Sequence, residues 1–176
     1  MEPQVYSAFS YKYHMIKDKP MLFDRELVNS GRMAATMVRN IIFAVGQSDR
    51  ENMVVMMLDA KNKVVGFNLV SVGTICRAAV DPRDILKTVI TTPCCMGIVI
   101  GHNHPSGDCT PSREDVVFTK ILVNCAFLLS IVFHDHVIVD MNSDAFYSFE
   151  EDGKMEEMLE AAKMIDLLSL KKAGDA

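Results

Sequence analysis

The sequence lacks the features of membrane and secreted proteins. No apolar run reaches the roughly 18 residues that a membrane-spanning helix needs. The start of the chain, residues 1–13, is polar and aromatic and does not resemble a signal peptide. We therefore expect a cytoplasmic protein without a membrane segment.

A cysteine framework is missing as well. The chain has five cysteines, an odd number, and none of them forms a C-x-x-C pair. Reduced thiols are therefore the simple interpretation. Cys109 lies inside the motif described below. We expect it to be a small loop residue, although a thiolate there could bind a metal adventitiously.

The chain also has no dense basic stretch of the kind that tight duplex binding needs. Its formal net charge is −5 and its pI is near 5.5. Arg32, Arg39 and Arg50 fall in one region, so a local basic patch stays open. Nucleic acid is thus an alternative partner that the charge does not favour.

What is present is apolar material for one domain, since hydrophobic residues make up 49% of the 176 residues. Ser30 is the expected N-cap of a first helix and Gly46 its stop, and Pro82 suits the first position of a second helix. The fold class expected is α/β, a mixed β-sheet with an antiparallel hairpin, flanked by helices. Periodicity predicts helices over 30–45, 82–91, 111–129 and 154–170, and strands over 5–15, 52–58, 63–72, 96–100, 130–140 and 144–149.

The segment that carries chemistry follows the short apolar run over 96–100 and reads HNHPSGDCTPSRED. His102 and His104 stand two residues apart, and in extended backbone such residues point the same way. Asp115 lies near the start of the following helix, and the intervening turn can fold it back toward the histidines. Two imidazoles and one carboxylate make a three-ligand zinc set that leaves a fourth position open for water.

Two plainer interpretations compete with a metal site. An H-x-H at a strand end is often only a pair of polar residues at a rim, and Ser112 with Asp115 is close to a capping box. Pro111, however, favours the first helical position. This would make Thr110 the N-cap and free Ser112 and Asp115 for other work.

The same string resembles the JAMM motif, H-x-H followed by S-x-x-D, of the JAB/MPN metallopeptidases, and most closely their RadC-like branch. The flanking segments MLDAKNKVVG, LVSVGT and DHVIV agree with that branch. The resemblance covers roughly residues 30–150 and implies a JAB/MPN fold, of cytidine deaminase-like architecture. It also implies a zinc-dependent hydrolase of the metallopeptidase or isopeptidase type, with Zn²⁺ held by His102, His104 and Asp115.

The superfamily uses a further glutamate on an earlier strand, and Glu51 matches that position, although it could be an ordinary exposed residue at a strand start. In the implied reaction, zinc lowers the pKa of its bound water toward roughly 7. Glu51 takes the water's proton and passes it to the leaving amine. Ser112 donates a hydrogen bond to the oxyanion that develops. The implied substrate is a peptide or isopeptide-type bond.

A second H-x-H, His134 and His136, lies in an apolar stretch without a carboxylate at ligand spacing. Asp135 would point to the opposite face of a regular strand. We expect a structural role for this pair, with His136 hydrogen-bonded in the core or next to the metal ligands.

The expected organisation has three parts. Residues 1–29 form an N-terminal extension, 30–150 the RadC-like JAB/MPN domain, and 151–176 a C-terminal helix that packs on or extends the domain. The terminal helix has an apolar face wide enough to cover a partner as well, so a homo-oligomer through it stays an open alternative.

RadC-like proteins were named for DNA repair, and many carry a helix-hairpin-helix region ahead of this domain. The residues before Glu51 show no glycine-rich hairpin between two helices, so we expect a short, stand-alone form with a weakened link to DNA. A nucleic-acid-binding module of DNA repair or mobile elements, and a non-catalytic MPN interaction domain, remain alternatives. The complete ligand set favours the hydrolase, because a scaffold needs no ligands.

Overall fold

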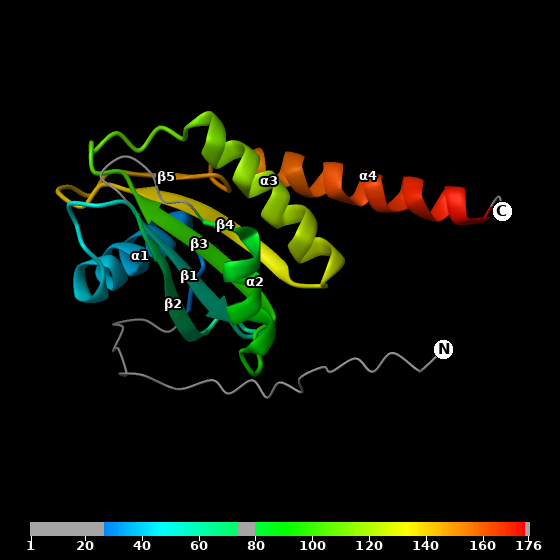
Figure 1. Cartoon of the computed structure of the whole chain (residues 1–176), viewed down its shortest axis with the longest axis horizontal. Helices are drawn as coiled ribbons and strands as arrows, with labels where there is room; N and C mark the ends of the chain where they lie inside the picture. Colours follow the sequence, from blue (N-terminus) through cyan, green and yellow to red (C-terminus); the bar gives the residue numbers. More distant parts are fainter. Residues whose placement is uncertain (1–26, 74–79, 175–176) are drawn as a thin grey trace, which may run out of the picture.

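A five-stranded mixed sheet forms the centre of the computed structural model, which describes residues 27–73 and 80–174, the side chains of 165–174 excepted. The strand order is β2-β1-β3-β4-β5, with β3 and β4 parallel and every other neighbouring pair antiparallel. This arrangement confirms the predicted α/β class and the predicted hairpin (Figure 1). The strands are β1 (Asn52–Leu58), β2 (Val64–Val72), β3 (Gly97–Asn103), β4 (Val132–Val139) and β5 (Phe146–Ser148); the helices are α1 (Gly31–Val45), α2 (Pro82–Thr91), α3 (Arg113–Leu128) and α4 (Lys154–Gly174).

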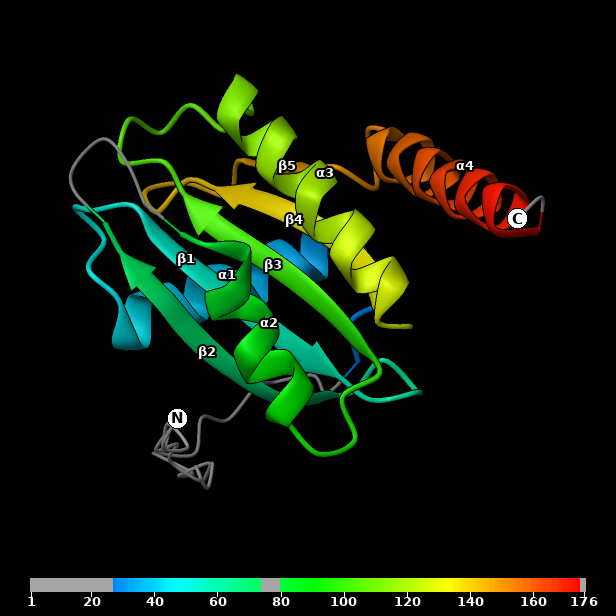
Figure 2. The same cartoon turned by 45° about the vertical axis from the view of Figure 1, so that its right-hand side comes forward.

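Helices cover both faces of the sheet, α1 on one face and α2 with α3 on the other (Figure 2). The central strands are buried on both faces, and all seven residues of β1 and of β3 are buried. Alternate residues of β3 therefore serve different cores. Val99 packs in the core under α1, whereas Ile98 and Ile100 pack in the core under α2 and α3.

The predicted helix signals act at the predicted residues. Ser30 caps α1 by accepting a hydrogen bond from the Met33 backbone N–H, and the helix ends before Gly46. Pro82 is the first residue of α2, which Asp81 caps. The predicted strand over 5–15 lies outside the described residues.

Two predicted boundaries near the candidate site are wrong. β3 does not end at Ile100 but continues through His102 and Asn103. His102 pairs with residues of both β1 and β4, and Asn103 pairs with a residue of β4. These polar residues stay in the sheet because each has hydrogen-bond partners in the interior. The following helix, α3, begins at Arg113 rather than at Pro111.

The terminal helix α4 packs its beginning on the domain and then runs away from the sheet (Figure 1). Met155, Met158 and Ala162 are buried against the core that also contains α2 and α3. The side chains of the last part of α4, residues 165–174, lie outside the described part, so an oligomer through the apolar face of α4 stays a prediction. Within the described residues, no helix is both long and apolar enough to cross a membrane.

Candidate metal centre

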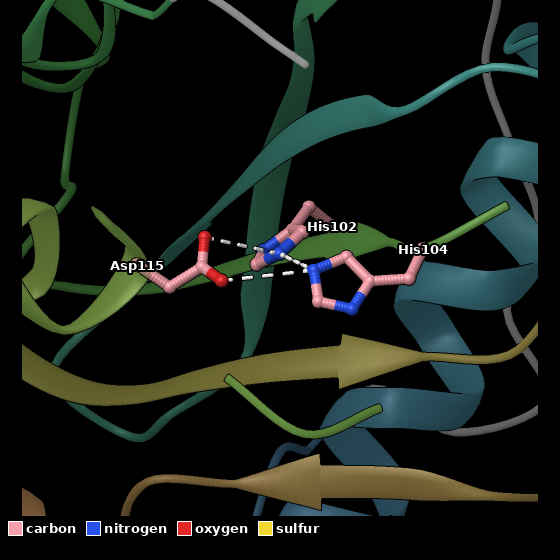
Figure 3. Close-up of side chains that lie close together, drawn as sticks. All are labelled: His102, His104 and Asp115. Carbon is pink, nitrogen blue, oxygen red and sulfur yellow. Dashed lines mark hydrogen bonds and ion pairs between the residues drawn. The ribbon is translucent and has the colours of Figure 1, made fainter. Parts of the chain in front are cut away.

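Three side chains converge at the end of β3 and the start of α3 (Figure 3). His102 Nε2 lies 3.0 Å from His104 Nε2 and 3.4 Å from Asp115 Oδ1, and His104 Nε2 lies 3.6 Å from Asp115 Oδ2. His102 is completely buried, while the other two are partly buried. Among the histidine, cysteine and carboxylate groups that the structure describes, this cluster is the one that could hold a metal ion.

His104 is turned toward the cluster by a tight loop directly after β3. The Gly107 backbone N–H donates to the His104 carbonyl, 3.0 Å away, with Pro105 at the second position of the turn, where its fixed φ fits. Gly107 has φ of +80°, which glycine adopts without strain. The chain then brings the Asp108 carbonyl to 2.6 Å from His104 Nδ1. A carbonyl only accepts, so Nδ1 carries the proton and Nε2 presents its lone pair to the cluster.

Asp115 is held by the capping box of α3, which corrects the predicted N-cap. Ser112, not Thr110, caps the helix, and its hydroxyl accepts from the Asp115 backbone N–H. In return, Asp115 Oδ2 accepts from the Ser112 backbone N–H at 2.7 Å and from the Ser112 hydroxyl at 2.6 Å. The cap falls at Ser112 because Asp115, three residues later, accepts from the Ser112 backbone N–H in return, whereas a cap at Thr110 would place Arg113, which has no acceptor, at that position. The cap and the metal site are therefore not alternatives, because the cap aims Asp115 at the histidines.

The arrangement fits a metal ion with tetrahedral coordination. Zinc bonds of about 2.1 Å at tetrahedral angles place ligand atoms about 3.4 Å apart, and the three separations observed are 3.0, 3.4 and 3.6 Å. The donor set of two imidazole nitrogens and one carboxylate oxygen suits zinc and leaves one position open. The donor set alone does not distinguish zinc from other first-row divalent metals.

The electrostatics of the cluster favour a cation between its members. Burial lowers the pKa of His102 to about 4, so its ring is neutral at pH 7. The neighbouring Asp115 carboxylate, followed by the Asp108 carbonyl, raises the pKa of His104 against the effect of burial. Burial acts to raise the pKa of Asp115, but the imidazoles and the hydrogen bonds from Ser112 outweigh it and hold that pKa well below its usual range. A proton or a metal ion would satisfy the same lone pairs, so protons compete with metal here.

The predicted Glu51 lies in the segment just before β1, next to the end of β3. That segment is fixed by Asn103, whose Oδ1 accepts from the Asn52 backbone N–H at 2.9 Å and whose Nδ2 donates to the Arg50 carbonyl at 2.8 Å. Glu51 is partly buried, and its charge contributes to the raised pKa of His104. Sequence reasoning missed Asn103, although its place between the two histidines puts it on the opposite face of the strand.

The second H-x-H does not form a metal-binding pair. His134 falls at a register irregularity between Phe133 and Asp135, and its ring lies against Gly97, at the other end of β3 from His102. His136 is completely buried and its Nε2 lies 2.9 Å from His102 Nδ1, so it has the predicted place in the core, beside a candidate ligand.

Cys109 stays outside the cluster. Its thiol donates to the Ala145 carbonyl, 3.5 Å away, and burial raises its pKa. A protonated thiol is a poor metal ligand, so the structure agrees with a small loop residue. The four cysteines in the described part, Cys94, Cys95, Cys109 and Cys125, are free thiols, and Cys76 lies outside that part.

Comparison with known proteins places this site in a family. A model of the RadC-like JAB domain matches residues 26–154, which include every candidate residue named above. The chain belongs to the RadC-like JAB domain family.

Two relatives illustrate how far the family likeness extends. A UPF0758 protein of Thermotoga maritima is 40% identical over 107 residues, covering 61% of this chain and 47% of the relative. A UPF0758 protein of Streptococcus suis is 32% identical over 139 residues, covering 78% of this chain and 53% of the relative. This RadC-like chain thus spans about half the length of the curated relatives it matches. Their names assign no reaction, so an activity has to be argued from the site.

Proposed function

We propose that this RadC-like JAB domain is a zinc-dependent hydrolase that cleaves a peptide or isopeptide-type amide bond. The observation that carries the proposal is the convergence of His102, His104 and Asp115 at separations close to those of tetrahedral zinc ligands. Three protein ligands leave a coordination position open, as catalytic zinc requires and structural zinc does not. Bound zinc would supply the acidification of water and the polarisation of the scissile carbonyl.

Glu51 is the proposed general base. Its carboxylate takes a proton from the attacking water and returns it to the nitrogen of the leaving amine. Two observations support this role: Asn103 anchors the backbone on both sides of Glu51 to the end of β3, and the charge of Glu51 acts on His104. An anchored backbone limits the entropy lost when the carboxylate takes up its reactive position.

Ser112 is the proposed hydrogen-bond donor to the oxyanion. Its one hydroxyl proton lies toward Asp115 Oδ2 in this structure, so the hydroxyl has to rotate to serve the substrate. The carboxylate would keep the hydrogen bond from the Ser112 backbone N–H during that rotation. The Ser112 hydroxyl would thus redirect its hydrogen bond from Asp115 Oδ2 to the oxyanion, and the helix cap would remain in place.

Arg32, Arg39 and Arg50, which could form a basic patch for nucleic acid, do not strengthen that alternative. The Arg39 guanidinium donates to the carbonyls of Asp140 and Ala145 and lies 3.8 Å from the Asp144 carboxylate. Arg32 lies over the ring of Phe146. Two of the three residues thus have partners inside the fold, and we retain the hydrolase as the proposed function.

The test is a Glu51→Gln variant compared with a Glu114→Gln control. Both changes remove one negative charge, but Glu114 is exposed on the first turn of α3. We expect Glu51→Gln to lose about 10²- to 10⁴-fold in hydrolysis, the range typical of a general base, while its zinc content stays that of the wild type. Internally quenched peptides and lysine peptides linked through the ε-amine would serve as substrates.

The control should hydrolyse these substrates at the wild-type rate. Full activity in Glu51→Gln would remove Glu51 from the mechanism. Zinc binding without hydrolysis of any amide by the wild type would leave the metal site standing and contradict the hydrolase.

A further inference from the structure

A line of buried polar groups runs from His102 away from the candidate metal centre into the core. His102 Nδ1 lies 2.9 Å from His136 Nε2, and His136 Nδ1 lies 2.6 Å from Thr119 Oγ1. Thr119 Oγ1 lies 2.6 Å from the Asp115 backbone carbonyl, one turn earlier in α3. All three side chains are completely buried. The line therefore starts at one candidate ligand and ends on the main chain of another.

The last group of this line fixes every proton in it. A carbonyl oxygen carries no proton, so the hydrogen bond to the Asp115 carbonyl uses the single hydroxyl proton of Thr119. Thr119 Oγ1 can then only accept, which places a proton on His136 Nδ1. His136 is completely buried against the ring of Phe149, and its two hydrogen-bond partners, Thr119 and His102, carry no negative charge. A buried charge without an opposite charge beside it is strongly disfavoured, so this ring carries only the proton on Nδ1 and its Nε2 is a bare acceptor. The proton between the two rings therefore belongs to His102 Nδ1.

We propose that Thr119 and His136 are positioning residues that hold His102 in the tautomer with Nδ1 protonated and Nε2 bare, aimed at the metal. The proposal rests on the metal site of the proposed function and extends it to two residues that touch neither metal nor substrate. His104 reaches the same tautomer through the Asp108 carbonyl. A backbone carbonyl thus fixes the tautomer of each histidine. His104 donates directly to the Asp108 carbonyl, and His102 is linked to the Asp115 carbonyl through His136 and Thr119.

The packing around His136 keeps this arrangement rigid. The ring of Phe149 stacks on the His136 ring at 5.0 Å with an interplanar angle of 7°. Thr119 comes from α3, His136 from β4 and His102 from β3, so the line also ties together the elements that present His102 and Asp115. Loss of a partner that orients a metal-bound histidine typically weakens metal binding about 10- to 100-fold.

The test compares Thr119→Val with Thr119→Ser in the full chain. Valine keeps the shape of threonine but removes the acceptor for His136 Nδ1, whereas serine keeps the hydroxyl. We expect zinc, measured by competition with a chromogenic chelator, to bind about 10- to 100-fold more weakly to Thr119→Val and with wild-type affinity to Thr119→Ser. A role in packing alone would not be rescued by the smaller serine side chain.

A second measurement needs neither metal nor activity. Nitrogen-15 NMR of the metal-free wild type at pH 8 should show His102 with a protonated Nδ1 and an unprotonated Nε2, and Thr119→Val should populate the other tautomer. A proton on Nε2 of His102 in the wild type overturns the proposal, as does wild-type zinc affinity in Thr119→Val. If Thr119→Val does not fold, the tautomer in the wild type decides. The predicted tautomer in a protein that hydrolyses nothing would contradict the proposed activity alone.

Discussion

The chain contains the same three-residue pattern twice, and the two copies have different fates. His102 and His104 stand where β3 ends, so a turn can swing the second histidine toward the first and α3 can add a carboxylate. His134 and His136 stand inside β4, one at a register irregularity and the other in the core. The spacing of two histidines alone therefore does not bring together groups that could hold a metal; here a strand end and a carboxylate from another element do so.

The two copies are also connected. His136 of the second pair hydrogen-bonds His102 of the first, from a neighbouring parallel strand. The second pair therefore contains one residue that bears on the candidate centre and one, His134, that does not. Variants made in parallel at the two pairs test whether only the first pair binds metal.

The largest expected difference is in zinc affinity, between variants of the two aspartates that accompany the pairs, Asp115 and Asp135. Asp115→Asn removes the charged ligand but keeps an acceptor for the Ser112 cap, and zinc affinity should fall by more than about a hundredfold, beyond the loss typical of a merely orienting residue. Asp135→Asn, beside the second pair, should leave zinc affinity unchanged. Chelator competition measures both; equal effects of the two variants would contradict the distinction.

Asp135 should instead affect stability, and in a pH-dependent way. Burial raises the pKa of this carboxyl from 3.8 to about 6, although Ser148 and the Glu150 backbone N–H donate to it. The folded protein therefore binds the proton more tightly than the unfolded chain. The stability that this proton contributes is present below about pH 4 and is lost as the pH rises through about 6, an effect of about 3 kcal/mol.

Asp135→Asn should therefore raise the melting temperature by several degrees at pH 8 and change it little at pH 4. The asparagine amide can accept from Glu150 and donate to the Ser148 hydroxyl, so both contacts have a counterpart. Thermal unfolding followed by circular dichroism at the two pH values measures the difference. A variant that is destabilised equally at both would show that Asp135 is charged and well paired in the fold.

A smaller difference, in the free energy of unfolding, is expected between variants of two glycines of β3. Gly101 precedes His102 in the chain, and Gly97 lies against His134. A Cβ at Gly101 would lie 2.6 Å from a methyl group of the buried Val38 on α1, so Gly101→Ala should destabilise by about 1–3 kcal/mol. A Cβ at Gly97 would meet the ring of the half-buried His134, which can move aside. Gly97→Ala should therefore destabilise the fold less than Gly101→Ala. Urea unfolding measures both variants, and a larger loss of stability in Gly97→Ala would contradict this expectation.

The candidate ligands could be predicted from the sequence because two local signals met in one short segment: the H-x-H spacing and the S-x-x-D at a helix start. The N-cap was predicted wrongly because Pro111 and Ser112 offer competing helix starts. Only the hydrogen bonds of Ser112 with Asp115 distinguish them.

Other parts of the site depend on contacts between distant residues. β3 continues through His102 and Asn103 because partners in other strands satisfy these polar side chains, and a local pattern of polar residues indicates a loop instead. The contact of His136 with Thr119 depends on the irregular register of β4 against β3, which no periodicity in the sequence reveals.

The most direct test of the account is the metal content of the purified chain by elemental analysis. The wild type, a His102→Ala/His104→Ala double variant and a His134→Ala control would be measured together. We expect about one zinc per chain, the stoichiometry of a single site, in the wild type and in the control, and none in the double variant. A wild type without metal after preparation in the presence of zinc, or a double variant that retains it, would contradict the assignment of His102, His104 and Asp115 as the metal centre.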